Sequence, residues 1–195
     1  QPRSPAPRGL SRRGGGRRLA RARRGARRAR ARRRTPGLRG DRRGLGRLDL
    51  LVNNAAGNFV RPALALPARG WQAVIDIALS GVFYCLQAVG RHMLERAEAG
   101  DKSAASIVNI SSDAGRRGTI GQINYGAAKS GVMGITMSAA REWAGRNIRV
   151  NSICFGVVET EMTETVRSEK FRDRLLAQVP MGRFSTPDEV AQPVC

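Results

Sequence analysis

The sequence contains few of the side chains that bind metals, form disulfides or stack on bases. Among its 195 residues there is one histidine, His92, there are three cysteines, and aromatic residues make up 5%. The cysteines, Cys85, Cys154 and Cys195, lie far apart in apolar settings, which is typical of reduced thiols rather than of a disulfide framework. We therefore expect no metal site and a reducing, cytoplasmic location.

Long apolar stretches are also lacking. No uninterrupted apolar run approaches the roughly 18 residues that mark a candidate membrane span, so we expect no association with a membrane. Apolar residues nevertheless make up 41% of the sequence. This share is enough for one domain with a hydrophobic core.

Negative charge is almost absent from the first quarter of the chain. Residues 1–47 hold 19 of the 35 basic residues but one of the 15 acidic residues, so they carry nearly all of the net charge of +20. Arginine, alanine, glycine and proline account for 38 of these 47 residues, without the period of a helix or a strand. We expect a disordered, low-complexity segment, because blocks of like charge repel and form no core.

Three interpretations of residues 1–47 stay open. An arginine-rich arm would neutralise nucleic-acid phosphates, but no aromatic residue is interleaved for base stacking. A transit peptide would be amphipathic and rich in serine, whereas only Ser4 and Ser11 are present. We favour an out-of-frame or misjoined stretch of a GC-rich gene, since GC-only codons encode these four residue types. Nucleic acid is then a partner only if the arm is genuine.

From Leu48 onward the pattern is that of an α/β domain. Short apolar runs predict strands, and apolar residues at helical spacing predict helices between them. The order strand, helix, strand, helix, strand is half of a doubly wound fold, so we expect residues 48–195 to form a Rossmann-like parallel sheet. The expected elements are, in chain order, 48–52, 71–93, 106–110, about 125–144 and 148–153.

Polar clusters follow each of the three expected strands. They are Asn53–Gly57, Ser111–Ser112 and Cys154–Thr160. In open parallel sheets, ligands bind beyond the carboxyl ends of the strands. We therefore expect these clusters to meet at one edge of the sheet and to form the functional site.

Tyr125 and Lys129 give the strongest indication of chemistry. Their i, i+4 spacing places both side chains on one face of a helix, where an ammonium favours phenolate and lowers the tyrosine pKa. A tyrosine of this kind exchanges a proton with a substrate oxygen near neutral pH. Ser112, at the end of a strand, could donate a hydrogen bond to the same oxygen.

The motifs resemble those of the short-chain dehydrogenases/reductases. The hallmarks of that family are Asn-Asn-Ala-Gly, a serine, Tyr-x-x-x-Lys, and a Pro-Gly turn followed by threonine. The match runs from about Gly46 to Cys195. The likeness is greatest to β-ketoacyl-[acyl-carrier-protein] reductases, in three segments: Gly121–Gly131, Glu159–Thr163 and Gln178–Arg183.

The resemblance implies roles for individual residues. Ser112 would orient the carbonyl, Tyr125 would be the general acid, and Lys129 would lower the pKa of the tyrosine and bind the nicotinamide ribose. Other cofactor contacts would lie beside the adenosine ribose and at the nicotinamide carboxamide. These contacts are Asn54 and Ala55 for the ribose, and Val158 and Thr160 for the carboxamide.

The resemblance also implies a function. The protein would be an oxidoreductase dependent on NADP or NAD that reduces a carbonyl to an alcohol, or performs the reverse oxidation. The expected substrate is a 3-oxoacyl thioester of acyl-carrier protein or coenzyme A, as in fatty acid biosynthesis, although another alcohol or sugar stays open. The full-length protein would be a cytoplasmic homo-oligomer, a tetramer.

Several positions depart from the family pattern. Ala78 stands where the family has an asparagine that holds a water in a proton relay, so the relay is in doubt. Phe155 replaces the expected proline, and Ala56 precedes Gly57 in the Asn-Asn motif. The run Asn53–Phe59 is more like that of 2,4-dienoyl-CoA reductases, a related family that lacks the relay asparagine but also lacks the tyrosine.

The phosphate-binding segment of a doubly wound fold is also missing. A glycine-rich turn after the first strand should cradle the cofactor pyrophosphate, and residues 1–47 do not supply one. We therefore expect a domain truncated at both ends, although Thr186–Glu189 has the form of a capping box that begins a helix. An alternative is an inactive fragment with a basic arm that binds nucleic acid.

Overall fold

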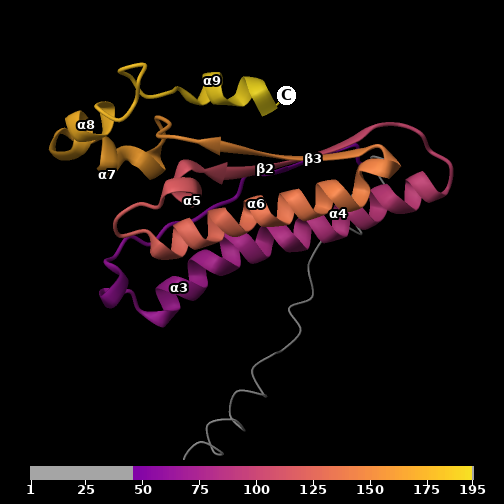
Figure 1. Cartoon of the computed structure of the whole chain (residues 1–195), viewed down its shortest axis with the longest axis horizontal. Coiled ribbons are helices and arrows are strands. Elements are labelled where there is room, and N and C mark those ends of the chain that lie inside the picture. The colour runs from indigo at the N-terminus through magenta and orange to yellow at the C-terminus, as the bar shows by residue number, and fades with distance from the viewer. Residues whose placement is uncertain (1–45, 195) are drawn as a thin grey trace, which may run out of the picture. The chain divides into compact units, whose positions relative to one another are not determined.

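Three parallel strands form the sheet in the part of the chain that the computed structural model describes, residues 46–194 (Figure 1). They are β1 (Leu50–Asn53), β2 (Ala105–Ser112) and β3 (Ile148–Phe155), in the order β1-β2-β3. In the register, Asn53 lies opposite Asn109, and Ser112 lies opposite Phe155. The carboxyl ends of the strands therefore meet at one edge of the sheet.

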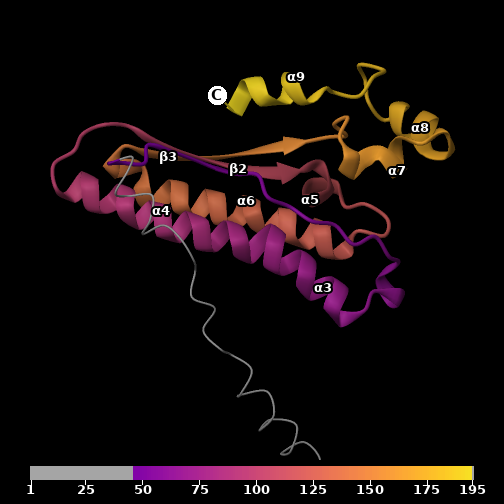
Figure 2. The ribbon, with the colours of Figure 1, turned by 180° about the vertical axis from the view of Figure 1, so that it is seen from behind.

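Two long helical segments cover one face of this sheet, as the two opposite views show (Figures 1 and 2). The first consists of α3 (Ala68–Ile75), a π-helical turn (Asp76–Ser80) and α4 (Gly81–Glu98). The second is α6 (Ile123–Trp143). The shorter helices and 3-10 turns are Ala63–Ala65, α5 (Asp113–Arg117), Ala144–Arg146, Glu161–Thr163, α7 (Glu164–Arg167), α8 (Glu169–Leu176), α9 (Pro187–Ala191) and Gln192–Val194.

The main core lies between the strands and helices α4 and α6. It consists of buried aliphatic side chains from both layers, and Trp143 packs against its rim. Gly90 lets that indole approach α4, because an added Cβ would lie 2.4 Å from Trp143. The buried residues of this core are Leu86, Val89, Met93, Ala105, Ile107, Ala139, Ile148 and Val150.

A buried chain of hydrogen bonds joins β1, β2 and α6. The amide of Asn53 donates to Asn109 Oδ1 at 2.8 Å, and the amide of Asn109 donates to Thr136 Oγ1 at 2.9 Å. Thr136 in turn donates to the carbonyl of Val132 at 2.8 Å. Because buried polar groups are costly unless they are paired, this chain fixes the register of β1 and β2 against α6.

The structure confirms the order and type of the expected elements from residue 48 onward. The first long helix begins three residues earlier than expected and is interrupted by the π turn, which the apolar spacing did not indicate. The expected helix start near the end is also confirmed: Thr186 accepts a hydrogen bond from the backbone of Glu189, and Pro187 occupies the first turn of α9. We expected residues 1–47 to be disordered. Residues 1–45 of that segment lie outside the part of the chain that the structure describes.

One helix passes a length and composition test for a membrane span, a test that the search for uninterrupted apolar runs did not apply. Ala68–Glu98, with 31 residues, is long and apolar enough to cross a membrane by length and composition, with 33% of its most apolar window buried. The sequence argument overlooked it because polar residues such as Gln72 and Ser80 interrupt the run, although Asp76 is its only charge from 71 to 90. Core helices pass the same test, and α4 packs against β1, β2 and α6.

Candidate active site

Tyr125 and Lys129 lie on the first turns of α6, as their spacing predicts. Lys129 is 1% exposed, and its ammonium donates a hydrogen bond of 2.7 Å to the carbonyl of Ile110 in β2. The same ammonium lies 5.7 Å from the centre of the Tyr125 ring. The helix therefore holds a buried cation between the end of β2 and the face of the phenol ring.

Ser112 is the last residue of β2 and the N-cap residue of α5. Its side chain accepts a hydrogen bond of 3.2 Å from the backbone N–H of Ala114, which caps the N-terminus of α5. The Ser112 side chain also lies close enough to Tyr125 to lower the pKa of its phenol. The structure therefore brings Ser112, Tyr125 and Lys129 together at the carboxyl edge of the sheet.

Close packing of α5 on α6 fixes this arrangement. Gly115 lies against the backbone of α6: an added Cβ would be 2.7 Å from the carbonyl carbon of Lys129 and 2.8 Å from the nitrogen of Ser130. Ser111 Oγ donates to the carbonyl of Lys129 at 2.8 Å, and Ser130 Oγ donates to the carbonyl of Gly115. The backbone of Lys129 is thus tied to both β2 and α5.

The surroundings shift both pKa values at the site. Burial raises the pKa of Tyr125 from its ordinary value of 10.0, and the Ser112 side chain opposes the rise. Burial lowers the pKa of Lys129, and the neighbouring Cys154 opposes that change. The direction for Tyr125 is the opposite of the one expected from the Tyr-x-x-x-Lys spacing, because desolvation of the phenolate is the largest influence on its pKa.

Asn54 and Ala55 directly follow β1 and are exposed. On the neighbouring strand, β3 ends at Phe155, opposite Ser112, and the chain then turns through Val158 and Thr160. The expected cofactor residues therefore follow two strands that flank β2. They lie beyond the same edge of the sheet as Ser112, Tyr125 and Lys129.

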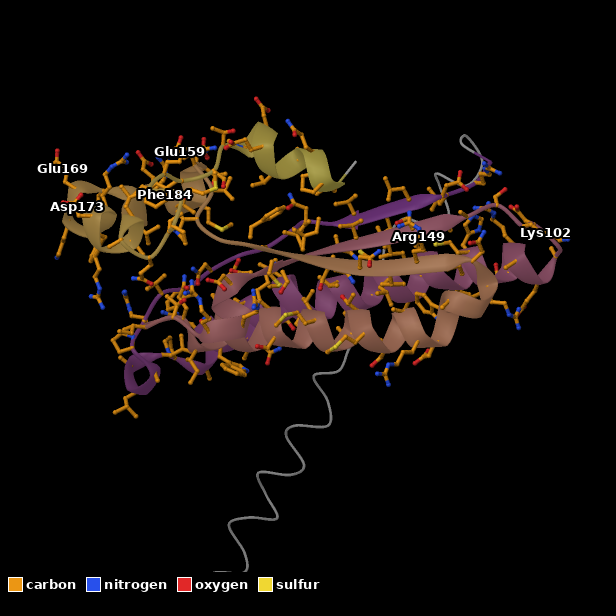
Figure 3. The ribbon with its side chains drawn as sticks, turned by 45° about the horizontal axis from the view of Figure 1, so that its top comes forward. Lys102, Arg149, Glu159, Glu169, Asp173 and Phe184 are labelled. Carbon is orange, nitrogen blue, oxygen red and sulfur yellow. The ribbon has the colours of Figure 1, made fainter. Side chains whose placement is uncertain are left out.

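Thr163 braces the turn after β3. Its hydroxyl donates to the carbonyl of Val158, and it accepts a hydrogen bond of 3.2 Å from the N–H of Thr160. The N–H of Glu159 donates to the carbonyl of Ser185 at 2.9 Å. Figure 3 shows Glu159 and Phe184 at this end of the sheet, with Lys102 and Arg149 toward the other end.

The residues at this edge fit the ribose and carboxamide parts of a nicotinamide dinucleotide. The donor set contains the Asn54 amide, the Lys129 ammonium and the hydroxyls of Tyr125 and Thr160, and these groups pair with sugar hydroxyls and amides. Within residues 46–194, no Gly-x-x-x-Gly-x-Gly turn follows a strand, so these residues do not supply the pyrophosphate cradle.

Ala78, at the position of the family's relay asparagine, lies in the π turn between α3 and α4. Its side chain is fully buried and packs with Val74 and Ala128. Its methyl group cannot hold a water molecule. The side chain therefore offers no hydrogen-bonding group to a relay.

Two residues at the site were missed by the sequence argument, Gly115 and Asn124. Gly115 gave no signal, because the close approach of α5 to α6 is a matter of tertiary packing. Asn124 could have been found: it precedes Ala128 and Val132 at intervals of four, on the stripe of α6 that is buried. A polar residue on a buried stripe needs partners, and its partners are local to the site.

Residues 38–170 match the family model described as short chain dehydrogenase. The chain belongs to the short-chain dehydrogenase family. The match begins ten residues before the domain start expected from composition. Members of the family use NAD or NADP.

Individual relatives cover much of the described chain. This chain is 46% identical over 149 residues to a 3-oxoacyl-[acyl-carrier-protein] reductase of Thermotoga maritima. The matched residues make up 75% of this chain and 57% of that protein. This chain is 40% identical over 152 residues to a probable 2,4-dienoyl-CoA reductase of Bacillus subtilis, over 76% of this chain and 58% of that protein.

Solved structures agree with the fold. A putative short-chain alcohol dehydrogenase from Sinorhizobium meliloti matches with a TM-score of 0.72 and 38% identity, over 80% of this chain and 60% of that one. A putative 2-deoxy-d-gluconate 3-dehydrogenase from Agrobacterium tumefaciens with bound NADP matches with a TM-score of 0.70 and 33% identity, over 75% of this chain and 58% of that one. The Rossmann-like parallel fold is therefore confirmed, and the chain spans less than two thirds of the length of these relatives.

Proposed function

We propose that this chain carries the catalytic part of an oxidoreductase that uses NADPH or NADH to reduce a carbonyl to an alcohol. The observation that carries the proposal is the grouping of Ser112, Tyr125 and the buried Lys129 at the carboxyl edge of the sheet. Two residues expected at the cofactor site, Asn54 and Thr160, follow β1 and β3, the strands that flank β2.

In this proposal the side chains bind and move one proton. Ser112 donates a hydrogen bond to the substrate carbonyl and turns its oxygen toward Tyr125. The phenol of Tyr125 gives its proton to that oxygen as the carbon is reduced, and Lys129 stabilises the phenolate that is left. When bound, the reduced nicotinamide supplies the hydride to the carbonyl carbon, so carbonyl, hydride and proton together give the alcohol and the oxidised cofactor.

The raised pKa of Tyr125 favours the reductive direction. A proton donor must be protonated at the working pH, and burial keeps this phenol protonated well beyond neutral pH. The reverse oxidation needs phenolate as a base, so it would require more alkaline conditions. The electrostatics of the site therefore support a reductase.

Exposed apolar side chains beside the site support an acyl substrate, with 3-oxoacyl-CoA or 3-oxoacyl-acyl-carrier-protein as the preferred class. Phe59 and Val60 are 37% and 53% exposed, and Ile120 and Ile123 are 86% and 52% exposed. The two pairs are neighbours, because the N–H of Arg61 donates to the carbonyl of Gly121 at 2.9 Å. Such a surface near the reacting carbonyl suits an acyl chain better than a sugar.

A second candidate is a 2,4-dienoyl-CoA reductase. It is favoured by the run Asn53–Phe59, by Ala78 and by the similarity to the Bacillus subtilis relative. The presence of Tyr125 favours carbonyl reduction instead, because a dienoyl reductase of this family works without that tyrosine.

The two functions are separated by one assay on the complete gene product. We expect NADPH or NADH absorbance to fall with acetoacetyl-CoA and to stay constant with a 2,4-dienoyl-CoA. Ser112→Ala should lower the rate with acetoacetyl-CoA, because the donor to the carbonyl is lost. Consumption of the cofactor with the dienoyl substrate alone would reject the first function in favour of the second.

We also propose that the protein is a homo-oligomer that works in the cytoplasm, with α4 and α6 forming the contact between copies. A groove of about 610 Å³ runs between these helices, away from the site, and its lining includes Phe83, Leu86, Ile135 and Trp143. Light scattering on the purified gene product tests the assembly. Replacing Ile135 by aspartate should lower the mass if copies meet there.

The inactive fragment with a nucleic-acid arm is the remaining alternative, and residues 1–45 of its arm, residues 1–47, lie outside the described part. If that arm binds RNA by charge, retention should fall steeply between low and physiological salt, because counterions are released on binding. Measured turnover of a carbonyl substrate would reject the inactive-fragment alternative.

A further inference from the structure

Asn124 is a fully buried amide at the site, and it lies next to Tyr125. Its exposed fraction is 0%, and its side chain has three hydrogen-bond partners in three different segments. Its Oδ1 accepts from the N–H of Tyr125 at 2.8 Å. Its Nδ2 donates to the carbonyl of Phe59 at 3.1 Å and to the carbonyl of Gly70 at 3.3 Å.

These partners are far apart in the sequence. Phe59 belongs to the loop between β1 and α3, the loop that begins with Asn54 and Ala55, and Gly70 lies in the first turn of α3. Tyr125 lies in the first turn of α6. One side chain therefore joins the loop after the first cofactor strand to the helix that carries the proton donor.

The surroundings show that the contact is tight. Gly70 faces the Phe59 ring, where an added Cβ would lie 2.8 Å from Cδ1. Gly121 has a positive φ of +78°, and its carbonyl accepts from the N–H of Arg61. The loop is thus held to the start of α6 at two points: the Arg61 N–H bonds to the Gly121 carbonyl, and the buried Asn124 amide bonds to the Phe59 carbonyl.

We propose that Asn124 is a positioning residue: it clamps the loop at Phe59 onto the first turn of α6 and so sets the distance between the Asn54–Ala55 segment and the Tyr125 phenol. The expected effect on the reaction rate rests on the proposed function, whereas the structural clamp does not. A proton donor must be placed within hydrogen-bond reach of the reacting oxygen, and a displacement of about 1 Å can cost about 100-fold in rate.

Asn124→Asp tests the clamp with one atom changed. The variant keeps an oxygen that accepts from the N–H of Tyr125, but an ionised carboxylate cannot donate to the carbonyls of Phe59 and Gly70 and is repelled by both. Burial without a cation raises the pKa of such a carboxyl, and the protonated form donates to one of the carbonyls again. The clamp should therefore be lost at high pH and partly restored at low pH.

The matched control is Asn147→Asp. Asn147 also donates from its amide to a backbone carbonyl, that of Lys102 at 3.1 Å, but it is exposed and lies in the turn after α6. The same chemical change there should leave the kinetics unaltered. Asn124→Leu, which keeps the same heavy-atom branching, removes both hydrogen-bonding functions and should lose rate at every pH.

The experiment measures kcat and KM of the complete gene product with acetoacetyl-CoA and NADPH between pH 5.5 and 9, and amide hydrogen exchange in peptides covering 57–66 and 121–130. For Asn124→Asp we expect kcat to fall about 10- to 100-fold at high pH and to recover as the pH falls, with faster exchange in both peptides. The wild type and Asn147→Asp should show neither change.

Each outcome decides one claim. An active wild type with an Asn124→Asp variant of equal kcat at every pH would overturn the positioning role, whatever the exchange data show. A wild type without turnover rejects the proposed function instead. In that case the exchange data still decide whether Asn124 holds the loop to α6, and unchanged exchange in Asn124→Asp would overturn the clamp.

Discussion

Replacing Gly115 by alanine tests how closely α5 must approach α6. The new methyl would lie 2.7 Å from the carbonyl carbon of Lys129 and 2.8 Å from the nitrogen of Ser130, both of them backbone atoms that cannot rotate away. The helices must separate by several tenths of an ångström, and overpacking of this kind costs roughly 1–3 kcal/mol of stability. Since Ser112 caps α5 and Lys129 lies on α6, the shift also changes the spacing of these two side chains.

We therefore expect Gly115→Ala to lower both the stability to urea and kcat, the latter by about 10- to 100-fold, as for a misplacement approaching 1 Å. Gly145→Ala is the matched control, because no atom lies within 4 Å of its added Cβ and the residue is exposed. It should leave both properties near those of the wild type. A Gly115→Ala variant with wild-type stability and kcat would refute the close packing of α5 on α6.

Three further predictions follow from the charges and the sheet edge. The pKa of Lys129 is lower in the folded chain than its ordinary value of 10.5, so between these two pH values the unfolded chain binds more protons than the folded chain. The free energy of unfolding should therefore rise with pH through that window. Lys129→Met should remove this rise in urea titrations at several pH values. Arg96→Lys should lower the denaturation midpoint, because Arg96 binds the Leu48 carbonyl and Asp101 at once, whereas Arg146→Lys at an exposed pair should not. Leu50→Lys should raise the solubility of this chain in sedimentation assays, since β1 is an edge strand among the described residues and Leu50 is 51% exposed.

The local pattern predicted the fold and the edge of the sheet at which Ser112, Tyr125 and Lys129 lie together. Strand and helix periods depend on neighbours in the sequence, so the elements from residue 48 onward were found with small errors at their ends. The i, i+4 spacing likewise predicted that Tyr125 and Lys129 share one face of α6. The ends of parallel strands then predicted the edge at which Ser112 joins them.

The electrostatics of the site could not be predicted from spacing alone. The ammonium of Lys129 is held by the carbonyl of Ile110, and this contact depends on the register of β2 against α6. Burial of Tyr125, which reverses the expected direction of its pKa, also depends on packing by distant segments. The same holds for Gly115 and for the amide of Asn124, whose partners lie 54 and 65 residues away.

The most direct test of the account is the kcat of Tyr125→Phe in the complete gene product, with NADPH and a 3-oxoacyl-CoA. The matched control is Tyr84→Phe, which removes the hydroxyl of a tyrosine that is 52% exposed on α4. Loss of the proton donor should lower kcat by about 10²- to 10⁴-fold, while Tyr84→Phe should keep the wild-type rate. A Tyr125→Phe variant that turns over as fast as the wild type would contradict the assignment of Tyr125 as the general acid.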